Sequence, residues 1–312
     1  CQAKAERLNY KRKQLALGKR DKIYEVITVK IAVVGLGLIG GSFCKAIKAY
    51  TQHTCLGVGR DLNSKSVQMA LQADAIDKAI IPEQLGEADL SIICLHPQGI
   101  IDFILNNQQY FRPGSIVIDA GGVKESIVSA VHDVLTARGV IFIGCHPLAG
   151  REFSGFAYSL PDLYKGASMI LTPLDSVPEE AKKTVEQLAR DLKFGRIVYT
   201  TPQEHDKTIA FTSQLAHVVS SAYIKSPTVK NESGFSAGSF KDLTRVAKLN
   251  EDMWTELFLM NQPALLYEVD TIIRALQEYR DALANQDAET LRGLLRDGRL
   301  LKEWSLKHSI TE

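Results

Sequence analysis

The stretch "KIAVVGLGLIGGSFCKAI", residues 30–47, decides the fold because it places four glycines within seven residues between two apolar segments. Its G-x-G-x-x-G pattern follows the apolar segment KIAVV directly and opens the segment GGSFCKAIKAY. In a dinucleotide-binding turn the first glycine permits the tight turn, the second lets the backbone approach a pyrophosphate, and the third lets helix and strand pack closely. The stretch therefore predicts a cofactor site made by Gly35, Leu36, Gly37, Leu38, Ile39 and Gly40.

The next apolar segment, CLGVGR, indicates which dinucleotide is bound. Asp61 follows it directly, about 20 residues after the glycines, where an acidic side chain can accept hydrogen bonds from the ribose hydroxyls of NAD and repel the 2′-phosphate of NADP. Arg60 beside it could instead pair with that phosphate. We expect NAD as the cofactor, with Arg60, Asp61, Leu95 and His96 among its contacts.

Two halves of the 312-residue chain differ in pattern. Residues 29–175 alternate short Ile- and Val-rich segments with helical patterns, which indicates a Rossmann-type, doubly wound, mostly parallel sheet covered on both faces. Residues 176–312 are dominated by helical periodicity, with long apolar helices typical of bundles and subunit interfaces. We expect an α/β fold: a basic leader over 1–28, an NAD-binding domain over 29–175, and an all-α substrate and dimerisation domain over 176–312.

Composition excludes several classes of function. The net charge of +1 provides no field for nucleic acid or an acidic membrane, and no segment has the length of a membrane span. The basic residues of the leader are interpreted as a solvated segment rather than a nucleic-acid arm. Five cysteines without paired spacing predict free thiols, no metal site and a cytoplasmic enzyme.

Polar residues follow three of the predicted strands, at the sheet edge where ligands bind in such folds. They are His96 after LSIICL, the Gly121–Lys124 segment after SIVIDA, and His146 after VIFIGC. His146 lies at a strand end with Glu152 six residues later, which favours a catalytic over a structural role.

The helical half adds four further candidates. His205 and His217 are twelve residues apart, roughly 18 Å along one straight helix, so both can contact one small substrate only if the helix breaks or a partner chain contributes. His217 lies in the apolar segment QLAHVV and fits a structural role equally well. Arg245 lies in a largely apolar stretch three residues after Asp242, and a buried guanidinium there needs an anionic partner, either Asp242 or a substrate carboxylate.

Together these motifs resemble the prephenate dehydrogenase family, which includes arogenate and cyclohexadienyl dehydrogenases. The resemblance spans about residues 29–285 and rests on GLGLIGGS, GRD, DAGGVK, HPLAGRE, YSLPDLYKGASMILTP, TPQEHD, LAH and DLTRVA followed by Trp254. It implies NAD(P)-dependent oxidative decarboxylation of prephenate to 4-hydroxyphenylpyruvate in tyrosine biosynthesis, by a homodimer built through the helical domain.

The resemblance also implies roles for single residues. The family's catalytic histidine matches His146, its carboxylate-binding arginine matches Arg245, and the histidine that recognises the substrate side chain matches His217. Glu152, His205 and Asp242 match a polar gate near the substrate. Gly122 departs from the family pattern, in which a serine helps to hold the catalytic histidine, so a water, Lys124 or another side chain takes its place, or His146 is held more loosely.

Three alternatives remain at this stage. The substrate could be arogenate rather than prephenate. The enzyme could be a β-hydroxyacid or imine reductase of the same architecture, although such enzymes would be expected to carry their acid on the helical domain. The protein could sense NAD without catalysis, which the presence of both His146 and Arg245 argues against.

Overall fold

The computed structural model describes residues 28–59 and 61–309, and within these ranges the chain forms two compact units. The first unit runs to Ile209 and also includes Lys248–Asn261, and the second consists of Ala210–Ala247 and the chain from Gln262 onward. Arg60 and residues 1–27 of the basic leader lie outside the described residues.

The strands are β1 (Lys30–Val34), β2 (Thr54–Val58), β3 (Lys78–Ile80), β4 (Leu90–Ile93), β5 (Ile116–Asp119), β6 (Ile141–Pro147), β7 (Ser168–Thr172) and β8 (Arg196–Tyr199). The helices are α2 (Leu38–Tyr50), α3 (Lys65–Gln72), α4 (Pro97–Asn107), α5 (Glu125–Thr136), α6 (Glu179–Asp191), α7 (Pro202–Ile209), α8 (Leu215–Tyr223), α9 (Gly238–Thr244), α10 (Glu251–Met260), α11 (Gln262–Ala284) and α12 (Ala288–Ser309). Short helical turns are η1 (Pro82–Glu87), η2 (Gln108–Tyr110), η3 (Phe156–Tyr158), η4 (Ala210–Gln214), η5 (Pro227–Asn231) and η6 (Arg245–Ala247).

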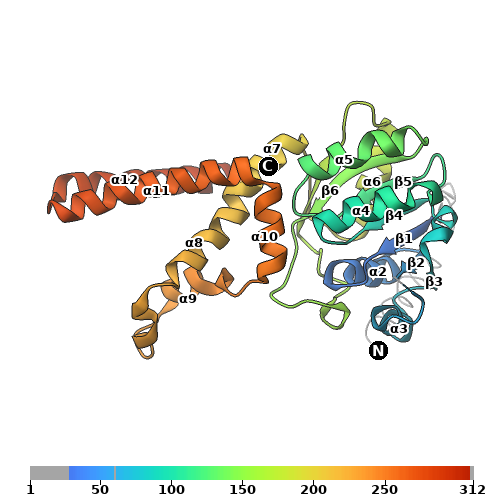
Figure 1. Cartoon of the computed structure of the whole chain (residues 1–312), viewed down its shortest axis with the longest axis horizontal. Helices are drawn as coiled ribbons and strands as arrows, with labels where there is room; N and C mark the ends of the chain where they lie inside the picture. Colours follow the sequence, from blue (N-terminus) through green and yellow to red (C-terminus); the bar gives the residue numbers. More distant parts are fainter. Residues whose placement is uncertain (1–27, 60, 310–312) are drawn as a thin grey trace, which may run out of the picture. The chain divides into compact units, whose positions relative to one another are not determined.

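The strands form one sheet in the order β3-β2-β1-β4-β5-β6-β7-β8. Figure 1 labels β1 to β6 of this sheet. All neighbouring strands are parallel except β6 and β7, which pair antiparallel with His146 opposite Ile170. The order reverses between β1 and β4, and such a switch point is where doubly wound sheets bind their ligands. The predicted fold class is confirmed. Sequence analysis did not predict β3, which has only three residues.

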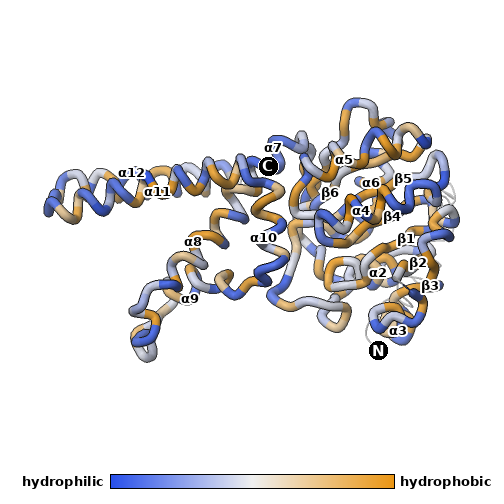
Figure 2. Tube along the Cα trace, in the orientation of Figure 1, coloured by the Kyte–Doolittle hydropathy of each residue, from blue (hydrophilic) through white to orange (hydrophobic). Residues whose placement is uncertain are grey.

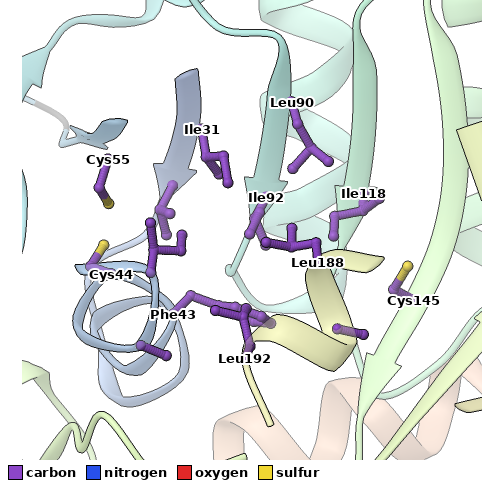
Figure 3. Close-up of a cluster of buried hydrophobic side chains, with 14 of the residues drawn as sticks. Ile31, Phe43, Cys44, Cys55, Leu90, Ile92, Ile118, Cys145, Leu188 and Leu192 are labelled. Carbon is purple, nitrogen blue, oxygen red and sulfur yellow. The ribbon is translucent and has the colours of Figure 1, made fainter. Parts of the chain in front are cut away.

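Side chains alternate between the two faces of the sheet, which is why its central strands are apolar throughout. In β1, Ile31 and Val33 belong to one buried cluster, with residues of α2, α3 and α6, whereas Ala32 and Val34 belong to a second, with residues of α4 and α5. Figure 3 shows part of the first cluster, with Ile92, Leu188 and Phe43 among its labelled side chains. Both faces of the sheet are therefore covered by helices.

The first unit extends beyond the domain boundary expected at residue 175. The helix α6 buries Val185 and Leu188 against the sheet, and β8 adds a parallel edge strand next to β7. After the second unit begins, the chain returns through α10, whose Glu256 accepts a hydrogen bond from the backbone N–H of Gln98 at 2.6 Å. Helical periodicity alone does not distinguish these helices from those of the second unit.

The second unit is built from α8, α9, α11 and α12, and α11 and α12 lie side by side as a long hairpin (Figure 1). Apolar and polar residues alternate along both helices of this hairpin (Figure 2). Many large apolar side chains on it are exposed in the single chain, including Tyr267 at 65%, Leu301 at 69% and Trp304 at 61%. No helix within the described ranges is both long enough and apolar enough to span a membrane.

Candidate active site

The glycine turn joins β1 to α2 at the switch point of the sheet. Gly35 has a φ of +83°, and a side chain there would overlap the carbonyl oxygen of Cys94, just beyond β4. A side chain at Gly40 would overlap the carbonyl oxygen of Gly35, so helix and strand can approach only without one. These two glycines have the steric roles predicted from their spacing.

The middle glycine differs from its neighbours because nothing lies within 4 Å of the position that its side chain would take. The turn thus leaves open space at Gly37, directly before the first turn of α2, whose N–H groups have no acceptor inside the helix. Open space and unpaired donors at the positive end of a helix fit the pyrophosphate of a dinucleotide. The residues present therefore fit the expected cofactor.

The other predicted cofactor contacts lie around the same edge. Leu95 is half-buried, and its side chain comes close to Gly35. His96 is exposed and precedes the first turn of α4. Asp61 follows β2 and is exposed, and its Oδ1 accepts a hydrogen bond from the backbone N–H of Asn63 at 2.7 Å. The structure does not describe Arg60.

A buried ion pair lies beneath the ends of β5 and β6. Lys124 and Asp119 are both fully buried, and Lys124 Nζ contacts Asp119 Oδ2. Asp119 also accepts hydrogen bonds from the backbone N–H groups of Gly121 at 2.8 Å and Cys145 at 3.0 Å. Since Cys145 immediately precedes His146, this pair fixes the backbone that presents the histidine.

His146 is half-buried at the end of β6 and contacts a second histidine. Its Nδ1 lies 2.9 Å from Nε2 of His205, and the two rings meet edge to face. Nδ1 of His205 lies 2.6 Å from Oδ1 of Asp206. His205 and Asp206 are only 2% and 3% exposed, so this chain of three side chains runs from the sheet edge into the protein.

Asp206 is held by the start of another helix. Its Oδ1 accepts a hydrogen bond from the backbone N–H of Lys124 at 2.7 Å, and its Oδ2 accepts one from Glu125 at 2.9 Å, both at the N-terminus of α5. No side chain of α5 caps that terminus. Asp206, on α7, therefore supplies the acceptors for the N-terminus of α5, although it lies 81 or more residues away in sequence. Asn261, directly after α10, donates from Nδ2 to the carbonyl oxygen of Asp206 at 2.8 Å. This hydrogen bond ties α7 to the end of α10.

Both histidines of this chain are poised to be neutral. Burial lowers the pKa of His146 well below its ordinary value, and the neighbouring His205 and Lys124 charges lower it further. Burial also lowers the pKa of His205, and its hydrogen bond to Asp206 opposes this effect without reversing it. A neutral imidazole offers a lone pair near neutral pH, which a general base requires.

Two further predicted residues lie in the segments that follow β5 and β6. Gly122 follows β5, and a side chain added there would come within 3.1 Å of Leu257 Cδ2 of α10. Glu152 is exposed in the loop after β6. Lys124, one of the replacements considered for the family's serine, is instead paired with Asp119, and His205 is the side chain that contacts His146.

The remaining predicted residues belong to the second unit. His217 is half-buried on α8 and its Nδ1 lies 2.9 Å from the carbonyl oxygen of Ser213. Burial lowers the pKa of His217, and the nearby charge of Arg245 lowers it further. Asp242 and Arg245 are exposed, so the expectation that Arg245 is buried was wrong for the single chain. Arg245 lies on η6, at the end of the apolar stretch that suggested burial.

The segment between His205 and His217 is not one uniform α-helix. Residues Ala210–Gln214 form a π-helix between α7 and α8, and the two compact units also divide at Ile209. The helical geometry changes between His205 and His217, and the two histidines belong to different units. A π-helical turn inserted between α-helices is frequent at functional sites.

Sequence reasoning identified His146 and His205 but missed Asp206, Asp119 and Asn261 as parts of the site. One signal was present: Asp206 follows His205 directly in TPQEHD, and α5 begins without a Ser, Thr, Asp or Asn to cap it. A missing local cap indicates that an acceptor comes from elsewhere. Nothing in the sequence indicates that α7 supplies it.

Family models match most of the chain. The model described as prephenate dehydrogenase, nucleotide-binding domain, matches residues 43–199, and the model described as prephenate dehydrogenase, dimerization domain, matches residues 201–297. The first match begins after the glycine turn, so the cofactor site rests on its own geometry.

Curated relatives and solved structures agree with these matches. The chain is 33% identical to a cyclohexadienyl dehydrogenase of Zymomonas mobilis, over 84% of this chain and 90% of the relative. It is 30% identical to a prephenate dehydrogenase of Bacillus subtilis, over 84% and 72%.

Among solved structures, prephenate dehydrogenase from A. aeolicus in complex with hydroxyphenyl propionate and NAD+ superimposes with a TM-score of 0.77 at 26% identity, over 89% of this chain and 99% of that one. Arogenate dehydrogenase from Synechocystis superimposes with a TM-score of 0.75 at 27% identity, over 88% and 99%. With a nucleotide turn that fits a dinucleotide and a neutral histidine at the adjoining sheet edge, the chain belongs to the prephenate dehydrogenase family and is an NAD(P)-binding oxidoreductase.

Proposed function

We propose that this protein is an NAD-dependent prephenate dehydrogenase, which converts prephenate to 4-hydroxyphenylpyruvate and CO2 in tyrosine biosynthesis. The observation that carries the proposal is the chain His146–His205–Asp206 at the carboxyl edge of the sheet that also bears the glycine turn. It presents a neutral imidazole on the side of the fold where the cofactor binds.

The chemistry needs one proton acceptor and good positioning. The bound nicotinamide supplies the hydride acceptor for the ring carbon that bears the hydroxyl group. His146 takes the hydroxyl proton as that carbon becomes a carbonyl. Loss of the ring carboxylate as CO2 then aromatises the ring, and His146 can return the proton to the phenolate oxygen, so that no net proton is released.

Residues of the second unit are proposed to bind the substrate. Arg245 would pair with a substrate carboxylate through charge-assisted hydrogen bonds, and His217 would contact the side chain. Asp242 and Glu152 would form a polar gate, and Gly122 would line the site. The dimerization-domain match supports a homodimer, in which a partner could supply some of these groups.

NAD is proposed over NADP because Asp61 follows β2, where a carboxylate accepts hydrogen bonds from the ribose and repels a 2′-phosphate. Prephenate is proposed over arogenate because the HPLAGRE loop and its continuation FSGFAYS contain no acid except Glu152 to receive an ammonium group. The likeness to a cyclohexadienyl and an arogenate dehydrogenase makes arogenate the second candidate.

The test is a set of initial rates with the purified full chain, measured from the absorbance of the reduced nicotinamide. Prephenate and arogenate are each combined with NAD and with NADP. We expect the highest kcat/KM for prephenate with NAD. A higher value for arogenate would reassign the substrate, a higher value with NADP would contradict the role of Asp61, and no turnover of either compound would reject the proposed function.

A further inference from the structure

In the hydrogen bond between His146 and His205, the surrounding atoms determine which ring donates and which accepts. Two neutral imidazoles can share one hydrogen bond in either sense, since each ring has one N–H and one lone pair. Which nitrogen of His146 keeps the lone pair decides which nitrogen can act as a base. The hydrogen-bond partners of His205 determine which nitrogen of His146 keeps the lone pair.

The two carboxyl oxygens of Asp206 have three hydrogen-bonding neighbours. Backbone N–H groups of Lys124 and Glu125 donate to them at 2.7 and 2.9 Å, and His205 Nδ1 lies 2.6 Å from Oδ1. Each oxygen of Asp206 therefore already accepts a backbone N–H group, so this carboxyl group acts as an acceptor toward its neighbours. The third neighbour, Nδ1 of His205, must then be a donor and carry a proton.

The proton on Nδ1 fixes the other nitrogen of His205. A neutral ring has one N–H, so Nε2 of His205 carries the lone pair and accepts. It lies 2.9 Å from Nδ1 of His146, which must therefore donate. With its proton on Nδ1, neutral His146 has its lone pair on Nε2. Burial lowers the pKa of both histidines, which agrees with two neutral rings.

We propose that His205 and Asp206 are positioning residues that hold His146 in the Nδ1–H tautomer, so that Nε2 of His146 is the atom that accepts the substrate proton. The assignment of a substrate proton rests on the proposed function, whereas the tautomer does not. This role differs from the gate expected for His205, because a ring only 2% exposed with both nitrogens occupied has no surface for substrate.

A purely structural role would use the same contacts to tie α7 to β6 and α5. The two roles differ in what happens when His205 is replaced by amides that match one nitrogen each. In His205→Gln the amide oxygen can occupy the place of Nε2 and accept from His146 Nδ1–H. In His205→Asn the amide reaches only the place of Nδ1, so it can contact Asp206 but leaves His146 Nδ1 without its acceptor.

The experiment measures the tautomer directly and then the rate. Nitrogen NMR of the ¹⁵N-histidine-labelled full chain, without substrate, should show His146 with a protonated Nδ1 and an unprotonated Nε2 above its pKa. The chain has seven histidines, and assignment uses single replacements. We expect His205→Gln to retain that pattern and about a tenth or more of wild-type kcat, and His205→Asn to lose the pattern and about 10²-fold or more in kcat.

A matched control is His132→Gln, which alters another buried histidine of the same unit, on α5 seven residues after Glu125, whose Nε2 lies 3.0 Å from the hydroxyl oxygen of Ser176. It should leave the spectrum of His146 and the rate unchanged. A wild-type spectrum with the proton on Nε2 of His146 would overturn the proposal, as would equal kcat values for the Gln and Asn variants. If neither variant folds, the wild-type spectrum still decides. If the spectrum is as expected but prephenate is not converted, the function fails and the tautomer stands.

Discussion

His146 combines a strand-end position with a lowered pKa, and this predicts how activity depends on pH. Since burial lowers the pKa of His146, the imidazole stays neutral as the pH falls through about 6.5, the value of an unperturbed histidine. Protonation below the lowered pKa removes the base. The acid limb of the rate profile should therefore lie below pH ~6.5 rather than at it.

His146→Asn retains a polar side chain of similar size and removes the base. We expect kcat to fall by about 10² to 10⁴-fold, the acid limb to disappear, and the dissociation constant of NAD to stay near wild type. Rate profiles over pH and cofactor titration of both proteins check this. A folded variant within tenfold of wild-type kcat that still shows its acid limb would remove His146 from the mechanism.

Arg245 provides a test of substrate binding by the second unit. If it pairs with a substrate carboxylate, Arg245→Ala should raise KM for prephenate by roughly 10- to 150-fold, because hydrogen bonds to charged groups contribute about 1.5 to 3 kcal/mol. Cofactor affinity should not change. Lys241→Ala, which removes another exposed cation from α9 four residues earlier, is the control. Equal KM values for the two variants would leave Arg245 without a role in substrate binding.

At the scale of single residues, the sequence predicted the strand-end position of His146 and the turn and close approach at Gly35 and Gly40, because each has a local cause. It did not predict that His205 contacts His146, since that contact depends on where α7 lies relative to β6. Nor did it predict the exposure of Arg245, because an apolar neighbourhood in sequence does not show which side of a helical turn is covered.

The turn between β1 and α2 allows steric and binding effects to be separated. In Gly40→Ala the new methyl group would overlap the carbonyl oxygen of Gly35, so α2 must shift away from the strand, and both stability and cofactor binding should fall. In Gly37→Ala the methyl group meets nothing within 4 Å in the chain itself. It would instead occupy the space proposed for the pyrophosphate.

We therefore expect Gly37→Ala to retain wild-type Tm and to bind NAD at least tenfold more weakly, a loss of about 1.4 kcal/mol. Gly40→Ala should lower both Tm and affinity. Thermal unfolding and titration of NAD by calorimetry measure the two effects. If Gly37→Ala bound NAD as tightly as the wild type, the pyrophosphate would not approach the backbone at that turn.

Among the elements, the buried strands were the most predictable because Ile and Val segments with two covered faces are distinctive. Three-residue β3 gives no such segment. The assignment of α10 to the first unit was likewise beyond prediction, since its amphipathic pattern resembles that of the neighbouring helices and only long-range packing against α4 distinguishes it.

We expect the hairpin of α11 and α12 to determine how whole molecules associate. On α11 the exposed apolar side chains Leu266, Ile273, Leu276 and Leu283 are spaced by seven, three and seven residues, which keeps them on one stripe. Such a stripe is expected to be buried against a second copy, in keeping with the dimerization-domain match. In a two-fold interface both subunits contribute the same patch, so one substitution in this stripe appears twice in the dimer.

Leu276→Glu should therefore shift the protein from dimer to monomer, because two buried carboxylates would lack partners. Thr271→Glu adds the same charge at an exposed position on the other side of α11 and should leave the dimer intact. Light scattering after gel filtration, at matched concentrations, gives the masses. A dimeric Leu276→Glu protein would place the interface elsewhere.

Lys248–Asn261 belongs to the first unit but follows Ala210–Ala247 of the second unit in the sequence. During synthesis, the first unit is therefore completed only after part of the second unit has been made. The ribosome releases the sheet first, through β8 and α7, and domains generally begin to fold as they emerge. Asn261, whose amide fixes the carbonyl of Asp206, is made only after Ala210–Ala247. A nascent chain thus holds a complete sheet and the His146–His205–Asp206 residues before it holds the helix that secures them. We therefore expect the contacts of this site to be completed late in synthesis, after the second unit has started to form.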